Sequence, residues 1–184
     1  MSENDWFYYP PLNERLGIDN EEYEKVYGYF NYSGSIVLDA GADWGTTAKF
    51  FISKGAKKII AIEQADIHFK NLCENAKRNN KIIPLHLGIH LSDFHNNQNS
   101  LSITWEKLIF CFEPDFIKAD VELAERYLVD VPNKLFKKIK GLVIECHGED
   151  IEISLTEKLL RNGFNIIGKH RDSSSIYWVV SFGR

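Results

Sequence analysis

A short glycine-containing segment carries the clearest chemical signal in the sequence. It reads DAGADWG over residues 39–45, directly after an apolar run and directly before a helical pattern. Gly41 allows a sharp backbone turn, and Gly45 allows the helix start to approach both the strand and a ligand closely. Glu63 ends the next apolar run, where a carboxylate can accept both hydroxyl groups of a ribose. The spacing therefore predicts a nucleotide-like ligand lying across free backbone N–H groups of the turn.

The charges around this turn distinguish two classes of cofactor. A dinucleotide site uses G-x-G-x-x-G, so that the backbone can approach a pyrophosphate. Here Asp43 stands at the second glycine position, where it would repel a pyrophosphate, and Thr46 or Thr47 stands at the third. Carboxylates such as Asp39 and Asp43 instead favour a cofactor with a cationic sulfonium and an ammonium group. These residues predict S-adenosylmethionine (SAM) rather than NAD, with a purely structural turn as the alternative. We expect the cofactor to contact Asp39, Gly41, Ala42, Asp43, Trp44, Gly45, Glu63, Gln64, Ile89 and His90.

A second group of polar residues ends two later apolar runs. Lys118 and Asp120 share one side of the first run, and Glu145 and His147 share one side of the second. These two strands should be neighbours, so we expect the four side chains to converge at one edge of a sheet. We predict that Glu145 pairs with a buried Lys118. We predict that Asp120 and His147 are catalytic and hold or deprotonate an acceptor hydroxyl for attack on the sulfonium methyl.

A metal ion is the alternative at this edge. Asp120, Glu122 and His147 together offer the carboxylate and imidazole ligands that a divalent ion uses. Our prediction is nevertheless a site without a metal. In that interpretation Glu122 and Glu125 belong to the first turn of a helix, where acidic side chains suit the helix dipole.

The elements that would position these residues alternate along the chain. Continuous apolar strands alternating with amphipathic helices are typical of a parallel sheet covered on both faces. The last two strands are joined by a short turn-rich segment, which permits only an antiparallel pair. We therefore predict an α/β fold with a Rossmann-like, doubly wound, seven-stranded sheet, mostly parallel with one antiparallel strand. The expected strands are 35–39, 58–63, 82–87, 115–120, 141–147, 164–168 and 176–182, and the expected helices are 46–54, 65–79, 121–131 and 151–162, with a further turn at 135–139.

The first 34 residues differ from the rest of the chain. They are rich in aromatic and acidic side chains, with Pro10, Pro11 and Gly17 interrupting the pattern. We predict a helix over about 20–30. We interpret residues 1–34 as an N-terminal, aromatic-rich helical cap, and residues 35–184 as the SAM-binding domain.

Several motifs together resemble a known family. VLDAGADWGTTAKFF (37–51) and AIEQ (61–64) look like motifs I and II of class I SAM-dependent methyltransferases. NLCENAKRNN (71–80), HLSD (90–93), DFIKADVELAE (115–125) and VIECH (143–147) then follow in an order similar to the FkbM-like methyltransferases. The resemblance implies a methyltransferase domain that acts on hydroxyl groups of sugars or polyketides. One position departs from the family, because Leu123 stands where the family has glycine after D-V-E.

Composition narrows the remaining function classes. The chain has 184 residues, 44% hydrophobic and 26% charged, with a formal net charge of −4, so no global basic field attracts nucleic acid. Three scattered cysteines form no C-x-x-C pair, and neither a signal sequence nor a membrane-spanning run is apparent, so we expect a cytoplasmic protein. The expected partner is a small-molecule or glycan acceptor. The alternatives are an RNA methyltransferase, using a basic patch within residues 49–81, and a non-catalytic SAM-binding interaction module.

Overall fold

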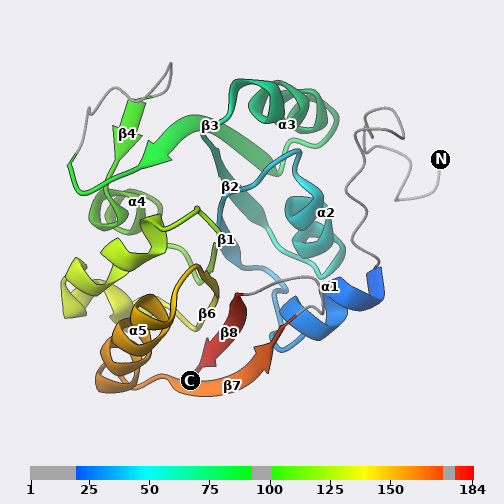
Figure 1. The fold of residues 1–184 in the computed structure, drawn as a ribbon. Coiled ribbons are helices and arrows are strands. Elements are labelled where there is room, and N and C mark those ends of the chain that lie inside the picture. The colour runs from blue at the N-terminus through cyan, green and yellow to red at the C-terminus, as the bar shows by residue number, and fades with distance from the viewer. Residues whose placement is uncertain (1–19, 93–100, 172–176) are drawn as a thin grey trace.

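Eight strands form one sheet with helices on both faces (Figure 1). The computed structural model describes residues 20–92, 101–171 and 177–184. The strand order is β4-β3-β2-β1-β5-β6-β8-β7, and β8 runs antiparallel to both of its neighbours, β6 and β7. The strands are β1 (Ile36–Ala40), β2 (Lys58–Glu63), β3 (Ile82–Ile89), β4 (Leu101–Ile103), β5 (Phe116–Ala119), β6 (Gly141–Cys146), β7 (Asn165–His170) and β8 (Trp178–Gly183).

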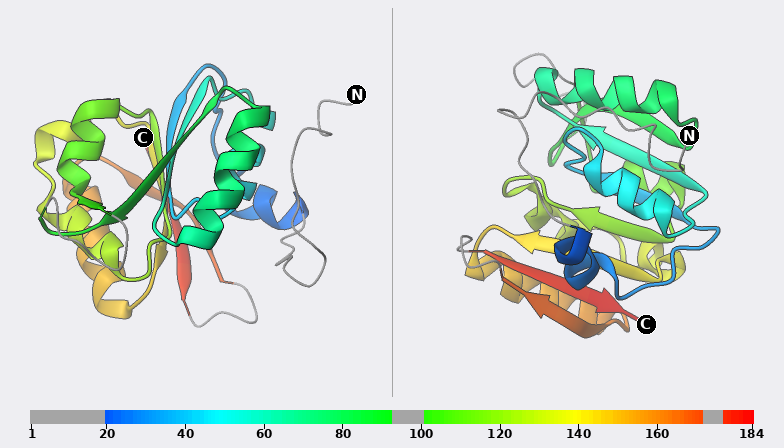
Figure 2. Two further views of the ribbon diagram at one scale, coloured as in Figure 1. Left: turned by 90° about the horizontal axis from the view of Figure 1, so that it is seen from above. Right: turned by 90° about the vertical axis from the view of Figure 1, so that its right-hand side faces the viewer.

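The helices divide into two layers (Figure 2). One layer packs on the sheet through a cluster of aromatic and aliphatic side chains that includes Tyr23, Phe51 and Leu72. The opposite layer packs through a larger cluster that includes Trp105 and Leu155. The first layer contains α1 (Asn20–Tyr27), α2 (Thr46–Ser53) and α3 (Asp66–Arg78); the second contains α4 (Trp105–Phe112), α5 (Glu149–Arg161) and the 3₁₀ helices η2 (Ala124–Asp130) and η3 (Asn133–Lys138).

The first strand, β1, lies in the middle of the sheet, and later strands are added on both sides of it. From β1 the chain proceeds through β2 and β3 to one edge, and then returns to β5 on the other side of β1. β1 and β5 are paired in register, with Asp39 opposite Lys118 and Ala40 opposite Ala119. Their carboxyl ends therefore form the point where the strand order reverses, which is where such sheets bind ligands. The predicted Rossmann-like, doubly wound architecture with one reversed strand is confirmed.

The strand count differs from the predicted seven because β4 adds one short strand at the edge. β4 pairs with Leu87–Ile89, so β3 is also longer than predicted. The helix α4 that follows was missed as well. Its signal is Thr104, whose hydroxyl accepts a hydrogen bond from the N–H of Lys107 at 3.3 Å, followed by inward-facing apolar residues. A three-residue strand is too short for alternation to reveal it.

The predicted helix over 121–131 is wrong. The chain makes a left-handed turn after β5, with φ of 49° at Glu122 and 83° at Leu123, and then forms the 3₁₀ helix η2 instead of an α-helix. A positive φ is costly for residues other than glycine. The glycine of the FkbM-like pattern thus corresponds to a backbone conformation that this chain reaches with Leu123. The turn brings both Glu122 and Glu125 toward His147, at the end of β6, rather than onto one helical face.

The predicted helix near residue 20 is present as α1, which ends at Tyr27. It packs on α2, with ring centroids 5.8 Å apart for Tyr23 and Phe50 and 5.6 Å apart for Tyr27 and Phe51. Two parts of the sequence analysis lie outside the described residues. They are the aromatic and interrupted segment before residue 20, with Pro10, Pro11 and Gly17, and most of the turn-rich segment that joins the last two strands. The division into a cap and a domain stays a prediction. In the described ranges no helix has the length and apolar character needed to cross a membrane.

Candidate active site

The glycine turn connects β1 to α2 and lies directly against the end of β5. Gly41 has φ of 75°, and a Cβ atom added to it would lie 1.7 Å from the backbone carbonyl oxygen of Asp120. Only glycine permits this approach. The expected cofactor turn and the expected catalytic acid are therefore adjacent in space, although 79 positions separate them in the sequence.

The backbone N–H groups of this turn are already used within the protein. Those of Gly41 and Ala42 donate to the carbonyl of Ile62 at 3.0 and 2.9 Å, and that of Gly45 donates to Ala42 at 2.8 Å. The N–H of Asp43 donates to the carboxylate of Glu63 at 2.8 Å. The expectation of free N–H groups is therefore wrong for these four residues. A ligand therefore cannot use these four donors without breaking hydrogen bonds within the protein.

Glu63 ends β2 and fixes the shape of the neighbouring loop. One carboxylate oxygen accepts from Asp43, and the other accepts from the N–H of Ala65 at 2.7 Å. Each carboxylate oxygen can accept a second hydrogen bond. Glu63 therefore keeps the capacity to bind hydroxyl groups while its own orientation is fixed by the backbone.

Asp39 and Lys118 form a buried ion pair beneath the turn. The Lys118 ammonium lies 3.7 Å from Asp39 and 3.4 Å from Asp120, and it donates a hydrogen bond to the carbonyl of Gly41 at 2.5 Å. The prediction that Glu145 is its partner is wrong, because the register of β1 and β5 places Asp39 opposite Lys118. Asp39 is fully buried and also accepts from Thr47 at 2.7 Å, so it supports the turn from below.

The charges of this pair stabilise each other. Burial alone would lower the pKa of Lys118, but Asp120 and Asp39 outweigh burial and raise it. Burial raises the pKa of Asp39, and the nearby Lys118 ammonium opposes that rise. Lys118 therefore carries the positive charge that connects the cofactor turn to Asp120.

Replacing Lys118 by methionine is expected to lower the free energy of unfolding by about 3–5 kcal/mol, because Asp39 would be left buried without its cation. Urea denaturation of Lys118→Met, compared with Lys57→Met at an exposed lysine, measures this loss. Adding Asp39→Asn to Lys118→Met should restore part of the stability, since the uncompensated charge disappears. A loss below about 1 kcal/mol in Lys118→Met would contradict the assigned pairing.

His147 follows β6 and is held by a residue that the sequence did not single out for it. One carboxylate oxygen of Glu125 accepts from the ring Nδ1 of His147 at 2.8 Å and from its backbone N–H at 3.0 Å. Burial would lower the pKa of His147, but the hydrogen bond and charge of Glu125, with Glu145 and Glu122, raise it to about 9. The sequence interpretation of Glu125 as an ordinary first-turn acid missed this role, because η2 turns it into the core.

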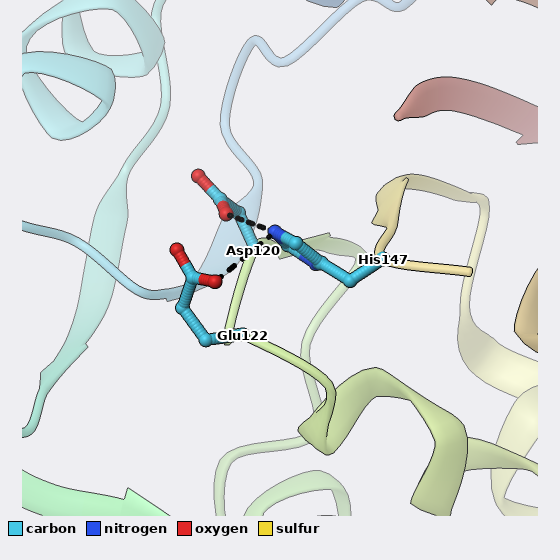
Figure 3. Close-up of side chains that lie close together, drawn as sticks. All are labelled: Asp120, Glu122 and His147. Atoms are coloured by element: carbon cyan, nitrogen blue, oxygen red, sulfur yellow. Dashed lines mark ion pairs between the residues drawn. The ribbon is translucent and has the colours of Figure 1, made fainter. Parts of the chain in front are cut away.

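The other ring nitrogen of His147, Nε2, faces the carboxylates of Asp120 and Glu122 (Figure 3). Nε2 lies 3.9 Å from a carboxylate oxygen of Asp120, 3.6 Å from Glu122 and 4.0 Å from Glu145. The predicted convergence of Lys118, Asp120, Glu145 and His147 at one edge of the sheet is therefore present. Burial, with Asp120 next in effect, raises the pKa of Glu145.

The remaining residues expected to contact the cofactor surround the turn at different depths. Asp43 is half-exposed and pairs with His68 at 2.8 Å. Trp44 is buried, its carbonyl accepts from Asn75 at 2.8 Å, and its ring lies edge-on to His68, so it packs the turn against α3. Gln64 is exposed at the end of β2, and its side chain lies over β3; Ile89 belongs to the core and His90 is half-buried near Tyr127.

A cavity of about 420 Å³ lies next to the two residues that flank His147 in the chain, Cys146 and Gly148. Its walls come from the end of β6, the start of α5, and β7 and β8, and they include Cys146, Gly148, Glu152, Lys169, Tyr177 and Trp178. The ring of Tyr177 lies 4.7 Å from that of His147, so one wall of the cavity borders the candidate catalytic residues. This volume falls in the range of sites for small ligands.

Comparison with known proteins gives structural matches only. No family model matches the sequence, and no curated protein does. The methyltransferase FkbM from Methylobacillus flagellatus KT is 19% identical, with a TM-score of 0.71 covering 88% of this chain and 48% of its own. Precorrin-6y C5,15-methyltransferase from Geobacter metallireducens GS-15 is 11% identical, with a TM-score of 0.59 covering 98% of this chain and 95% of its own. The chain has the class I methyltransferase fold.

A third structural match is a protein whose structure contains bound SAM. The fibrillarin of Aeropyrum pernix, solved with natively bound SAM, is 14% identical and has a TM-score of 0.52 covering 82% of this chain and 66% of its own. The resemblance to FkbM-like methyltransferases agrees with the match to FkbM, of which this chain spans about half the length (48%). At these identities the likeness concerns the methyltransferase fold, and chemistry has to be argued from the residues.

Proposed function

We propose that this protein is a SAM-dependent methyltransferase that transfers a methyl group to a hydroxyl of a small molecule or glycan. The observation that carries the proposal is the contact between the glycine turn at Gly41 and the backbone of Asp120. Methyl transfer requires the donor and the acceptor to be held next to each other and in line. A cofactor over the turn and an acceptor at Asp120 would meet that requirement.

The electrostatics of the turn favour a cationic cofactor. Asp39, Asp43 and Glu63 surround it, and Lys118 and His68 are the bases paired with them. The sulfonium and ammonium groups of SAM would be attracted to the excess negative charge, whereas a pyrophosphate would be repelled. In this proposal Glu63 accepts the ribose hydroxyls, and Gln64 and His90 lie toward the adenine.

The acceptor chemistry is assigned to Asp120 and His147. Asp120 accepts the hydroxyl proton as the acceptor oxygen attacks the methyl carbon; the S–CH₃ bond breaks, and its electron pair stays on sulfur as S-adenosylhomocysteine forms. The raised pKa of His147 makes it a hydrogen-bond donor near neutral pH rather than a base. The cavity beside His147 provides room for a sugar-sized acceptor.

Titration calorimetry tests the cofactor assignment. We expect SAM and S-adenosylhomocysteine to bind with micromolar dissociation constants and NAD to show no heat of binding, because the carboxylates around the turn would repel its pyrophosphate. Binding of NAD alone would reverse the assignment.

The same cofactor then serves to identify the acceptor. Incubation with methyl-labelled SAM and separate sets of hydroxylated small molecules, glycans and RNA is expected to label the first two sets. Labelling confined to RNA, with binding that falls steeply with salt, would favour the RNA alternative. Of the basic residues in question, Lys54 and Lys77 are paired with Glu24 and Glu74, which weakens a basic patch. Cofactor binding with no labelled acceptor would favour a non-catalytic module.

A further inference from the structure

Three potential metal ligands meet at the carboxyl end of β5 and β6 (Figure 3). Asp120, Glu122 and His147 each offer one ligand atom, and these atoms all lie within 4.8 Å of one another. Nε2 of His147 is 3.6 Å from Glu122 and 3.9 Å from Asp120. Two ligands of one ion with bonds of about 2.1 Å lie at most about 4.2 Å apart. Both of these distances can therefore be spanned by a single ion without movement of the backbone.

The imidazole is a buried group directed at the acidic side chains and not satisfied by them. The side chain of His147 is only 4% exposed. All the carboxylate oxygens that pair with Nε2 are 3.6 Å or more away, beyond normal hydrogen-bond length. The gap between Nε2 and these oxygens is of the size that an ion bound to both sides would fill.

The opposite side of the ring is arranged as it is in metal-binding histidines. Such histidines generally donate their second ring N–H to a carboxylate, which fixes both the tautomer and the ring plane. Glu125 supplies that carboxylate at 2.8 Å, and it also holds the backbone N–H of His147. Glu125 is fully buried, so it holds both the ring and the backbone of His147 in a fixed position.

The charge around His147 is mainly negative. Glu122, Glu125 and Glu145 approach His147 together with Asp120. Lys118 is the nearby base, and it is shared between Asp120 and the buried Asp39. Several carboxylates therefore face one imidazole, which is the charge distribution that a divalent cation would balance.

We propose that Asp120, Glu122 and His147 form a binding site for one divalent cation of the Mn²⁺ type. A mixed set of one imidazole and two carboxylates suits Mn²⁺ better than Ca²⁺, which takes oxygen ligands only, or Cu⁺, which prefers sulfur. Asp120 and His147 are fixed by Lys118 and Glu125. Glu122 is 88% exposed, so its side chain is free to close the remaining distance.

An ion at this place would displace the proton of Nε2 and would leave coordination positions open toward solvent. On the proposed methyltransferase function, and only on it, those positions would receive an acceptor oxygen beside the cofactor turn. Binding of the ion itself is independent of methyl transfer and can be measured without SAM or an acceptor.

The test uses Mn²⁺ as the probe and the electron paramagnetic resonance signal of free Mn²⁺ as the readout. We expect the full chain to bind one Mn²⁺. We expect Glu122→Gln, at an exposed side chain that leaves the fold intact, to weaken binding by at least about tenfold. The matched control is Glu106→Gln, which removes an exposed carboxylate from the first turn of α4 and should leave Mn²⁺ affinity unchanged.

Two results would overturn the site. One is no stoichiometric Mn²⁺ binding, in which case a proton on Nε2 is the cation that these carboxylates hold. The other is equal Mn²⁺ affinity in wild type and Glu122→Gln, which would place the ion elsewhere. SAM affinity, measured on the same two proteins, keeps the proposals apart. Mn²⁺ binding without SAM binding would remove the proposed function and leave the metal site, and SAM binding without Mn²⁺ binding would do the reverse.

Discussion

Gly41→Ala is expected to lower the free energy of unfolding by more than about 4 kcal/mol, enough to remove most of the stability of a domain of this size. The added Cβ would lie 1.7 Å from the carbonyl oxygen of Asp120, which belongs to the backbone and cannot rotate away. Relief requires β1 and β5 to separate at their paired ends. The left-handed conformation adds strain of about 1–2 kcal/mol. Thermal and urea denaturation measure the total.

A second glycine with a similar φ serves as a control, because it distinguishes the steric clash of an added Cβ from the strain of the left-handed backbone. Gly163 has φ of 83°, similar to that of Gly41, but a Cβ there would meet nothing within 4 Å. Gly163→Ala should therefore cost only the conformational strain of about 1–2 kcal/mol. If both variants lost the same stability, the close approach of the turn to Asp120 would not be the reason for glycine at position 41.

Asp120→Ala is expected to reduce turnover by about 10²–10⁴-fold while leaving SAM affinity within about threefold of wild type. Asp120 lies beyond the glycine turn, at the edge where its carboxylate is one-third exposed and faces His147. Its loss removes the group that orients the acceptor hydroxyl and takes up its proton. Release of S-adenosylhomocysteine in the presence of the identified acceptor gives the rate, and calorimetry gives the cofactor affinity.

The control for this variant is Asp130→Ala, at an exposed aspartate at the end of η2. It removes the same charge without touching the candidate site, and should keep full turnover. Normal turnover in Asp120→Ala would show that the acceptor site is assigned to the wrong edge. Loss of both turnover and SAM binding would instead indicate that Asp120 mainly supports the glycine turn through Lys118.

Hydrophobic periodicity and the positions of turn-forming residues in the sequence were sufficient to predict most of the strands and helices. The runs at 58–63 and 141–147 are buried on both faces and therefore read as continuous apolar strands. Position-by-position alternation then placed Lys118 with Asp120, and Glu145 with His147, on one side. These local patterns predicted the convergence at the sheet edge because the carboxyl ends of parallel neighbours must coincide there.

Local patterns failed where a distant contact overrides them. Residues 121–131 have a helical sequence pattern, but the chain leaves β5 through a left-handed turn at Glu122 and Leu123. Alternation along two neighbouring strands predicted Glu145 as the partner of Lys118, yet the register of β1 with β5 supplies Asp39 instead. Glu125 had no sequence signal for its contact with His147, 22 positions away.

The amino-acid sequence by itself determined the alternation of strands and helices and the turn at Gly41, and it predicted a cationic cofactor, because these depend on side-chain type and short-range spacing. Only the tertiary structure decided which charges neutralise each other. Lys118 pairs with Asp39 and Asp120, and His147 is oriented by Glu125, because strand register and a left-handed turn bring together groups that are remote along the chain. Because these groups are largely buried, the folded state depends on the pairings, since an unpaired charge in the interior is strongly destabilising.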